Sequence, residues 1–378
     1  MITRTAPGKL FLLGEYAVVT PGRDSIVMSV DRQVSVTVVW APRASHHLLV
    51  CSENYSGTAR FDLIDRQLRP ATGTSVPRGF EHVVSAVEVI HGYAMEHGVA
   101  LPPLELHITS ALHENGVKIG LGSSGAVVVA TVAAVAAALG LEPTTDERYR
   151  LAMLATARLD PQGSGGDLAA STWEGWVAYS APDRGELARM FERYGADNTI
   201  RREWPGFSAR VLRPPTDLTL EVGWTGTPSS TPAMVAKLPR QQRGFNTFYP
   251  LFLTRSDECV RDAVAAVAAD DSAGVVQQIR RFRLLLEMAD NIADAGIFTE
   301  RLTALCRAAE ELGGSAKPSG AGGGDCGLAA FNDPEPSRRD ALRDRWRADG
   351  IQPLALSVTG VADPSIPSPP RRHDDCQS

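Results

Sequence analysis

The first part of the chain combines a short apolar run with a stretch in which apolar and polar residues alternate. Residues 9–13 form the run, and Val34–Val38 alternates valine with serine and threonine. A period of two predicts a half-buried strand, because successive side chains of a strand point to opposite faces. We therefore predict strands at both places. Further short apolar runs predict strands at 48–51, 104–110, 173–179, 208–212, 218–224, 327–331 and 353–358.

Between these runs, apolar residues recur at the spacing of a helix. Residues 80–97 place Val83, Val87 and Ile90 on one face. Residues 126–141 are rich in Ala and Val on every side, which is typical of a buried helix. Because strands and helices are mixed without a regular βαβ rhythm, we predict an α+β fold. Further helices are predicted at 147–159, 257–269, 272–290, 296–312 and 337–348.

A charged and polar stretch suggests where the chain divides. The 378 residues are enough for two domains of ordinary size. Residues 181–206 contain Gly, Pro and many charges, which is typical of a boundary. We predict an N-terminal domain over residues 1–185 and a C-terminal domain over residues 186–361. The end of the chain, residues 362–378, is rich in Pro, Ser, Arg and Asp and is expected to be disordered.

Composition narrows the classes of protein. The formal net charge is −6, with both signs spread along the chain, so a nucleic-acid partner is not expected. The five cysteines form no CxxC pair, which argues against a disulfide framework and favours the reducing cytoplasm. We see no signal-peptide pattern at the start and no apolar stretch long enough for a membrane span. A cytoplasmic protein without a membrane partner is therefore expected.

The strongest local signal is the segment Lys118–Ala126, which reads KIGLGSSGA and leads into the Ala/Val helix. Small residues let a backbone approach an anion closely. The helix that follows points unpaired N–H groups and the positive end of its dipole back into the loop. The segment therefore predicts a phosphate-binding site. Ser123 and Ser124 can cap the helix there or reach a magnesium ion.

Two other interpretations of this loop remain open at this point. Gly120, Gly122 and Gly125 satisfy the dinucleotide-binding pattern GxGxxG. That pattern needs a second strand after the helix, and residues 140–143 lead straight into another predicted helix instead. The loop can also be an ordinary cap of a core helix. A P-loop is excluded because the chain has no GxxxxGK[ST] sequence.

Three further segments have residues suited to phosphoryl chemistry, each with an ordinary alternative. Asp167 ends the sequence GSGGD and can orient or deprotonate an attacking oxygen, or simply stabilise a turn. Lys9 begins an apolar run and can pair with Asp167 or a phosphate, or extend to solvent. The glycines of Lys317–Asp325 suit close packing against a ligand, or a flexible hairpin.

Together, in this order and spacing, these segments resemble the motifs of the galactokinase/homoserine kinase/mevalonate kinase/phosphomevalonate kinase (GHMP kinase) superfamily. The resemblance spans the chain from Ala6 to about Val358. It implies an N-terminal domain like domain 2 of ribosomal protein S5 and a ferredoxin-like C-terminal domain. It also implies an active site in the cleft between them, with ATP and Mg²⁺ as cofactors.

The resemblance also implies roles for particular residues of this sequence. Asp167 would be the catalytic carboxylate, Lys9 its basic partner and Ser124 the magnesium ligand. The ATP phosphates would be bound by Lys118, Gly120, Leu121, Gly122, Ser123, Ser124, Gly125 and Ala126. The acceptor would be bound by Lys9, Tyr16, Ser164, Gly165, Ser319, Gly320, Ala321 and Gly322.

Within the superfamily, three features resemble the bacterial phosphomevalonate kinases. Tyr16 stands where mevalonate kinases typically have His, the loop Gly163–Ala169 lacks their His-Gly-x-Pro context, and Gly223–Thr231 is similar to a phosphomevalonate kinase segment. The reaction implied is ATP-dependent phosphorylation of (R)-5-phosphomevalonate to 5-diphosphomevalonate in the mevalonate pathway of isoprenoid biosynthesis. Mevalonate kinase, a related mevalonate-type kinase or decarboxylase, and an inactive ligand-sensing relative remain alternatives.

The chain also departs from the family pattern. Mevalonate kinases have a metal-binding Glu eleven positions before the catalytic Asp, where this chain has Thr156. Pro232-Ala233 stands where a basic residue is expected, so one contact to the substrate phosphate needs a replacement. The candidates, each also readable as a surface charge, are Lys118, Lys237 and Arg240. A phosphomevalonate site needs more cations than a mevalonate site, and Lys9, Lys118 and the run Arg280–Arg283 are the candidates for these. The sequence leaves monomer and homodimer equally open.

Overall fold

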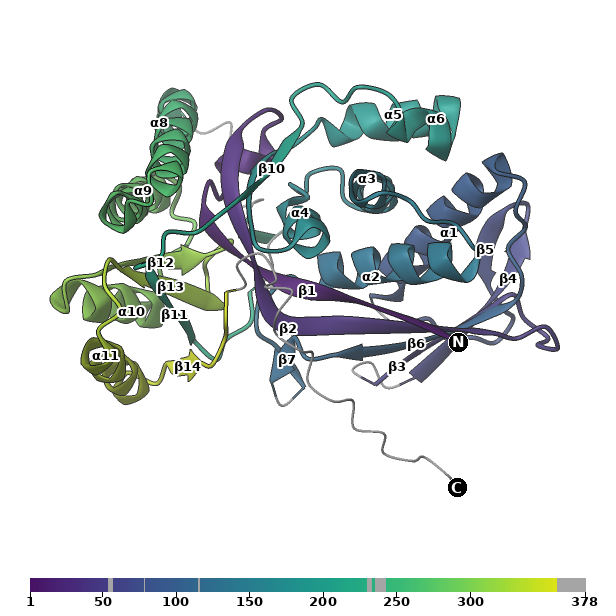
Figure 1. Ribbon diagram of the computed structural model, residues 1–378, viewed down its shortest axis with the longest axis horizontal. Coiled ribbons are helices and arrows are strands. Elements are labelled where there is room, and N and C mark those ends of the chain that lie inside the picture. Colours follow the sequence, from purple (N-terminus) through teal and green to yellow (C-terminus); the bar gives the residue numbers. More distant parts are fainter. Residues whose placement is uncertain (54–56, 78, 115, 230–232, 235–242, 359–378) are drawn as a thin grey trace.

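The computed structural model describes residues 1–53, 57–77, 79–114, 116–229, 233–234 and 243–358 (Figure 1). The predicted tail at 362–378 lies outside these residues, as do Lys237 and Arg240. Two separate layered units are visible, each with a sheet covered by helices. In the described part of the chain, no helix is long and apolar enough to cross a membrane.

The N-terminal unit is built on an eight-stranded sheet with the order β10-β9-β2-β6-β3-β4-β5, in which β1 pairs with β2. The long strand β2 pairs antiparallel with β1, β6 and β9, and β3 runs parallel to β6. Its strands are β1 (Ile2–Leu13), β2 (Asp24–Trp40), β3 (Leu48–Ser52), β4 (Gly57–Ile64), β5 (Gln67–Pro70), β6 (Leu104–Ser110), β9 (Trp176–Ser180) and β10 (Ser208–Leu212). A small hairpin, β7 (His113–Glu114) and β8 (Val117–Lys118), stands apart from it.

Helices cover one face of this sheet (Figure 1). They are α1 (Phe80–Glu96), α2 (Ser123–Ala138), α3 (Thr145–Ala157), α4 (Gly166–Trp173), α5 (Arg184–Tyr194) and α6 (Ala196–Ile200), with the short η1 (Ala17–Val19) after β1. The apolar helix α2 packs against α1, α3 and α4 and against the sheet, which explains its lack of a polar face. A capping box between Thr144 and Glu147 sets the start of α3.

The C-terminal unit has a four-stranded sheet with the order β12-β13-β11-β14. Along the chain a strand, helices, two strands, a helix and a strand follow one another, which is the ferredoxin-like arrangement. The elements are β11 (Thr219–Trp224), α8 (Arg243–Ala268), α9 (Ser272–Ala293), α10 (Glu300–Glu311), β12 (Ser315–Ser319), β13 (Cys326–Phe331), α11 (Pro336–Ala348) and β14 (Gln352–Leu354). The predicted α+β fold is therefore confirmed.

The predicted division at residue 185 needs correction. Helices α5 and α6 pack on α3 and α1, and strand β10 pairs with β9, so all three belong to the N-terminal unit. The two sheets separate between Leu212 and Thr219. The charges of residues 181–206 suggested a boundary, but apart from the buried Arg184 most of them lie on the exposed side of α5 and α6, which cover the first core.

Candidate active site

A cleft of about 480 Å³ gathers most of the predicted site residues. This volume falls within the roughly 300–1,000 Å³ that is typical of small-molecule sites. Residues of the N-terminal unit form most of its walls, and Ser229, Gly320, Ala321 and Asp325 close it from the C-terminal unit. The other lining residues are Lys9, Phe11, Glu15, Tyr16, Val18, Val19, His82, Lys118, Gly120, Leu121, Gly122, Ser123, Ser124, Gly125, Thr156, Asp160, Gly163, Ser164, Gly165, Asp167 and Arg184.

The glycine loop turns into α2 at the edge of this cleft. Gly120 and Gly122 have φ values of +81° and +75°, a backbone conformation that side chains rarely allow. Gly122 is the N-cap of α2, so the first N–H groups and the dipole of a sixteen-residue helix face the cleft. The loop is tied to β1 by a hydrogen bond of 2.8 Å from Lys9 N to Leu121 O. This geometry suits an anion such as a phosphate.

Asp167 lies in the first turn of α4, directly beside the glycine loop. A Cβ atom on Gly125 would lie 2.4 Å from Asp167 Oδ2, so only glycine allows this approach. The backbone before Asp167 is fixed by Tyr179, whose hydroxyl donates a 2.6 Å hydrogen bond to Ser164 O. Tyr149 OH lies 2.8 Å from Tyr179 OH, and burial raises the pKa of both phenols well above the ordinary range. Both tyrosines therefore stay protonated and support the segment.

Lys9 reaches the cleft from β1, on the other side of the glycine loop. A Cβ atom on Gly122 would lie 2.6 Å from Lys9 Cγ and 3.4 Å from Asp167 Cβ, so the two side chains flank one glycine. Lys9 is 8% exposed, and its Nζ lies 5.1 Å from the centre of the Phe11 ring. The predicted ion pair between Lys9 and Asp167 is not found among the described residues. The ammonium group is thus close to the carboxylate without being neutralised by it.

The third glycine-rich segment packs against the first. The Tyr16 hydroxyl donates a hydrogen bond to Ala321 O, and burial raises the pKa of this phenol far above its ordinary value. Lys317 Nζ forms a fully buried ion pair with Glu15. Burial lowers the pKa of the Lys317 ammonium, and the Glu15 carboxylate opposes this effect. These contacts bring Gly320 to the cleft, where a Cβ atom on it would lie 3.4 Å from Lys9 Nζ.

Three predicted site residues do not line the cleft. Ala126 is fully buried in the first turns of α2. The Ser319 hydroxyl bonds to both backbone groups of Phe11, at 2.9 Å to its N and 3.0 Å to its O, and joins the two units instead. Gly322 packs on Ile297, where a Cβ atom on it would lie 2.6 Å from the Ile297 backbone oxygen. Sequence motifs show which loop approaches a ligand and cannot distinguish its facing residues from its supporting ones.

The structure also adds residues that the sequence reasoning missed. Asp325 ends the third glycine-rich segment. Its side chain packs on the first glycine loop, because a Cβ atom on Gly120 would lie 2.5 Å from Asp325 Cβ. It accepts a 2.9 Å hydrogen bond from Ser229 N, and burial raises the pKa of its carboxyl group. Arg184 and Thr156 line the cleft as well. Their positions follow from α3 and α5 packing together, which no short motif encodes.

The basic run Arg280–Arg283 lies away from the cleft. Arg280 donates to Gly314 O at 3.2 Å, and Arg281 pairs with Asp262 at 2.8 Å. Arg283 pairs with Glu310 at 2.9 Å. The suggestion that this run binds substrate is therefore wrong, because its side chains join α9 to neighbouring elements.

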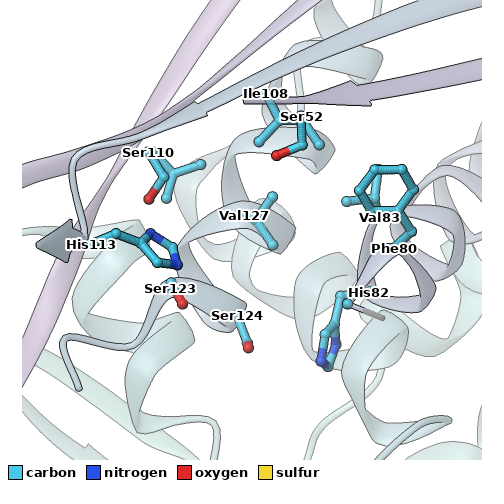
Figure 2. Close-up of a pocket in the computed structure, with 12 residues that line it drawn as sticks. Ser52, Phe80, His82, Val83, Ile108, Ser110, His113, Ser123, Ser124 and Val127 are labelled. Atoms are coloured by element: carbon cyan, nitrogen blue, oxygen red, sulfur yellow. The ribbon is translucent and has the colours of Figure 1, made fainter. Parts of the chain in front are cut away.

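A second, mostly apolar hollow adjoins the glycine loop (Figure 2). Ser123, Ser124 and His82 line both the cleft and the hollow, which measures only about 30 Å³, so the two are adjacent. Burial lowers the pKa of His82 and that of His113, which favours neutral rings around this space. The apolar walls are formed by Val34, Phe80, Val83, Ile108 and Val127.

Comparison with known proteins decides the family. The family model described as "GHMP kinases N terminal domain" matches residues 81–175, and the one described as "GHMP kinases C terminal" matches residues 266–352. The phosphomevalonate kinase of Streptomyces sp. (strain CL190) is 49% identical over 362 residues, which cover 94% of this chain and 96% of that protein. The chain belongs to the GHMP kinase family.

Other GHMP kinases are less similar in sequence. The mevalonate kinase of Thermococcus gammatolerans is 27% identical and covers 86% of this chain and 87% of that protein. The structure of Streptococcus pneumoniae phosphomevalonate kinase in complex with phosphomevalonate and AMPPNP has a TM-score of 0.82 and 27% identity, and covers 94% of this chain and 99% of that one. This GHMP kinase is therefore a homologue of phosphomevalonate kinase, and the predicted superfamily and two-domain fold are confirmed.

Proposed function

We propose that this GHMP kinase transfers the γ-phosphoryl group of ATP to the phosphate of (R)-5-phosphomevalonate, giving 5-diphosphomevalonate and ADP. The proposal rests on one observation above all. The glycine loop at the start of α2, Asp167 and Lys9 converge within contact distance around Gly122 and Gly125. Phosphoryl transfer is catalysed mainly by positioning and charge neutralisation, and this cluster supplies both.

ATP would bind in the cleft, beside the glycine loop of the N-terminal unit. Its phosphates would lie on the glycine loop, where backbone N–H groups and the helix dipole favour anions. Its base would point toward the apolar hollow of Figure 2, beside Phe80, Val83 and Val127; this hollow measures about 30 Å³ and must widen to admit the base. Because burial lowers the pKa of His82 and His113, these rings can accept or donate hydrogen bonds without adding charge.

Magnesium fits the donor set of the cleft. In the described part of the chain, no cluster of three or more His, Cys, Asp or Glu residues could hold a metal ion alone. Mg²⁺ usually keeps several waters and binds through one or two protein oxygens together with substrate phosphates. Ser124 and Asp167, both lining the cleft, would be those protein groups. When bound, the ion would neutralise charge on the transferred phosphoryl group.

The chemistry of this acceptor changes the role expected for Asp167. A phosphate monoester has a second pKa near 6, so its attacking oxygen is already ionised at neutral pH. No base is then required, and Asp167 instead orients the cations around the transferred group. Lys9, which lacks a carboxylate partner among the described residues, is available to hold the two phosphates that approach each other.

A coupled ADP-release assay on phosphomevalonate and mevalonate, with Mg²⁺ and ATP, tests the proposal. We expect turnover on phosphomevalonate and little or none on mevalonate. Turnover on mevalonate alone would refute the choice of acceptor while leaving the kinase assignment intact.

The cytoplasm is the expected compartment, in keeping with Cys51, Cys259, Cys306 and Cys326 being free thiols.

A further inference from the structure

Arg184 is a buried cation on the wall of the cleft. It is the first residue of α5 and is only 6% exposed, and it is one of the cleft-lining residues. A charge that has lost its hydration needs a partner, because burying an unpaired ion is strongly unfavourable. The partner of Arg184 therefore calls for an explanation.

The contacts of Arg184 within the protein are to neutral groups. Its two terminal nitrogens donate to Asp160 O at 2.6 Å and to Thr156 Oγ1 at 2.9 Å, at the end of α3. Its Nε has no hydrogen-bond partner among the described residues. The Asp160 carboxylate accepts from Gln162 N at 3.0 Å and makes no ion pair with Arg184 in the described structure.

Arg184 and the Asp160 carboxylate both lie beside Gly163. A Cβ atom on Gly163 would lie 2.8 Å from each of them, so a larger residue would fill the space between them. Gly163 begins the segment that ends at Asp167. The guanidinium group thus lies on the cleft wall beside the segment that leads to Asp167, and each of its terminal nitrogens has a second N–H that the bonds to Asp160 and Thr156 do not use.

We propose that Arg184 binds the carboxylate of the acceptor. This inference rests on the proposed function, since phosphomevalonate has a phosphate at one end of its five-carbon chain and a carboxylate at the other. The phosphate must lie at Lys9 and Asp167, where transfer occurs. The opposite end then needs a second cation, and the planar fork of an arginine matches a carboxylate.

A merely structural role is the competing explanation, because Arg184 also supports the end of α3. The two are separated by comparing phosphomevalonate with its neutral primary amide, 5-phosphomevalonamide, in steady-state kinetics. For the wild-type enzyme we expect kcat/KM to fall about 100-fold from acid to amide, the usual scale for losing one partner of a buried charge pair. Arg184→Gln should lose about as much on the acid, mainly through KM for the acceptor, with KM for ATP unchanged.

The decisive comparison is the amide. Arg184→Gln should turn over the amide within about threefold of the wild-type rate, because the contact is already absent from that substrate. Equal losses on acid and amide would overturn the inference and leave Arg184 as a support of α3. A wild-type enzyme that does not phosphorylate phosphomevalonate at all would overturn the proposed function, a result distinct from equal losses.

Two further variants guard against misfolding. Arg184→Lys keeps the charge and should retain a preference of about tenfold for acid over amide; the absence of any preference would overturn the inference. Arg150→Gln is the matched control, since Arg150 donates to Arg202 O at 3.0 Å and stacks on Trp204 outside the cleft. Its kinetics on both substrates should equal those of the wild type.

Discussion

At the scale of single residues, the site depends on how closely Asp167 approaches the glycine loop. Its Oδ2 occupies the space that a Cβ atom of Gly125 would need, at 2.4 Å. Two sequence segments that are about forty residues apart thus meet at one glycine. The motifs predicted that both would be near a phosphate. They could not predict this contact, because it depends on how α2 and α4 pack.

Replacing Asp167 by asparagine keeps its shape and removes its charge. We expect kcat to fall at least about 10³-fold, because the cations around the transferred phosphoryl group lose their orienting charge. ATP binding, measured by fluorescence titration or calorimetry, should change little. A variant with near-normal turnover would show that Asp167 has no part in catalysis.

His91 gives a prediction about pH. Its ring is buried in α1, its Nδ1 has no partner in the described structure, and burial lowers its pKa below 6.5, with His47 and Arg66 adding to the effect. As pH falls below about 6.5, His91 takes up a proton more readily in the unfolded chain than in the folded one. Acid therefore reduces the free energy of unfolding. His91→Phe should flatten the decrease in Tm between about pH 7 and 5. His107→Gln, at an exposed ring, is the control, and an unchanged slope in His91→Phe would contradict the account.

At the scale of elements, hydrophobic periodicity predicted the pieces better than their assembly. Helix α1 and strands β6 and β13 lie almost where the patterns placed them. Strand β12 was mistaken for part of a glycine-rich loop, because its sequence Ser-Ala-Lys-Pro-Ser lacks apolar alternation. Its residues are all buried, mainly against β13, α9 and α10, so tertiary contacts rather than propensity make it a strand.

Gly125→Ala tests the fit between the α2 loop and the α4 segment. The added Cβ must displace the Asp167 carboxylate, so we expect kcat/KM to fall on the order of 10²-fold, as for a displacement of about 1 Å. Gly92→Ala, in α1, is the control, because a Cβ there meets nothing within 4 Å. That change should leave activity unaltered and raise the free energy of unfolding by about 0.5–1 kcal/mol. Steady-state kinetics measures the activity of both variants, and urea unfolding measures their stability. Full activity in Gly125→Ala would refute the predicted contact.

At the scale of the whole molecule, a buried ion pair joins the two units. Glu15 follows β1, Lys317 belongs to β12, and their side chains are 2% and 0% exposed. The family resemblance directed attention to the glycines that follow this lysine and missed the pair itself. Its effect depends on two segments 302 residues apart, which sequence spacing alone does not bring together.

Lys317→Met leaves the Glu15 carboxylate buried without its partner. We expect a loss of about 3–5 kcal/mol in the free energy of unfolding, together with reduced kcat, because the third glycine-rich segment is no longer held against the cleft. The double variant with Glu15→Gln should recover part of this stability, since the stranded charge is removed. Thermal and urea unfolding provide the test. A single variant as stable as the wild type would contradict the assigned role of the pair.

Both substrates are expected to meet in this cleft, where a phosphate accepts the phosphoryl group. The most direct test follows ³¹P NMR spectra of the purified enzyme with Mg²⁺, ATP and (R)-5-phosphomevalonate in equal amounts. The account predicts that the monoester resonance is replaced by two coupled diphosphate resonances as ADP forms, and that Asp167→Asn blocks the change. An unchanged monoester resonance, with ATP consumed in a parallel sample that contains mevalonate instead, would contradict it.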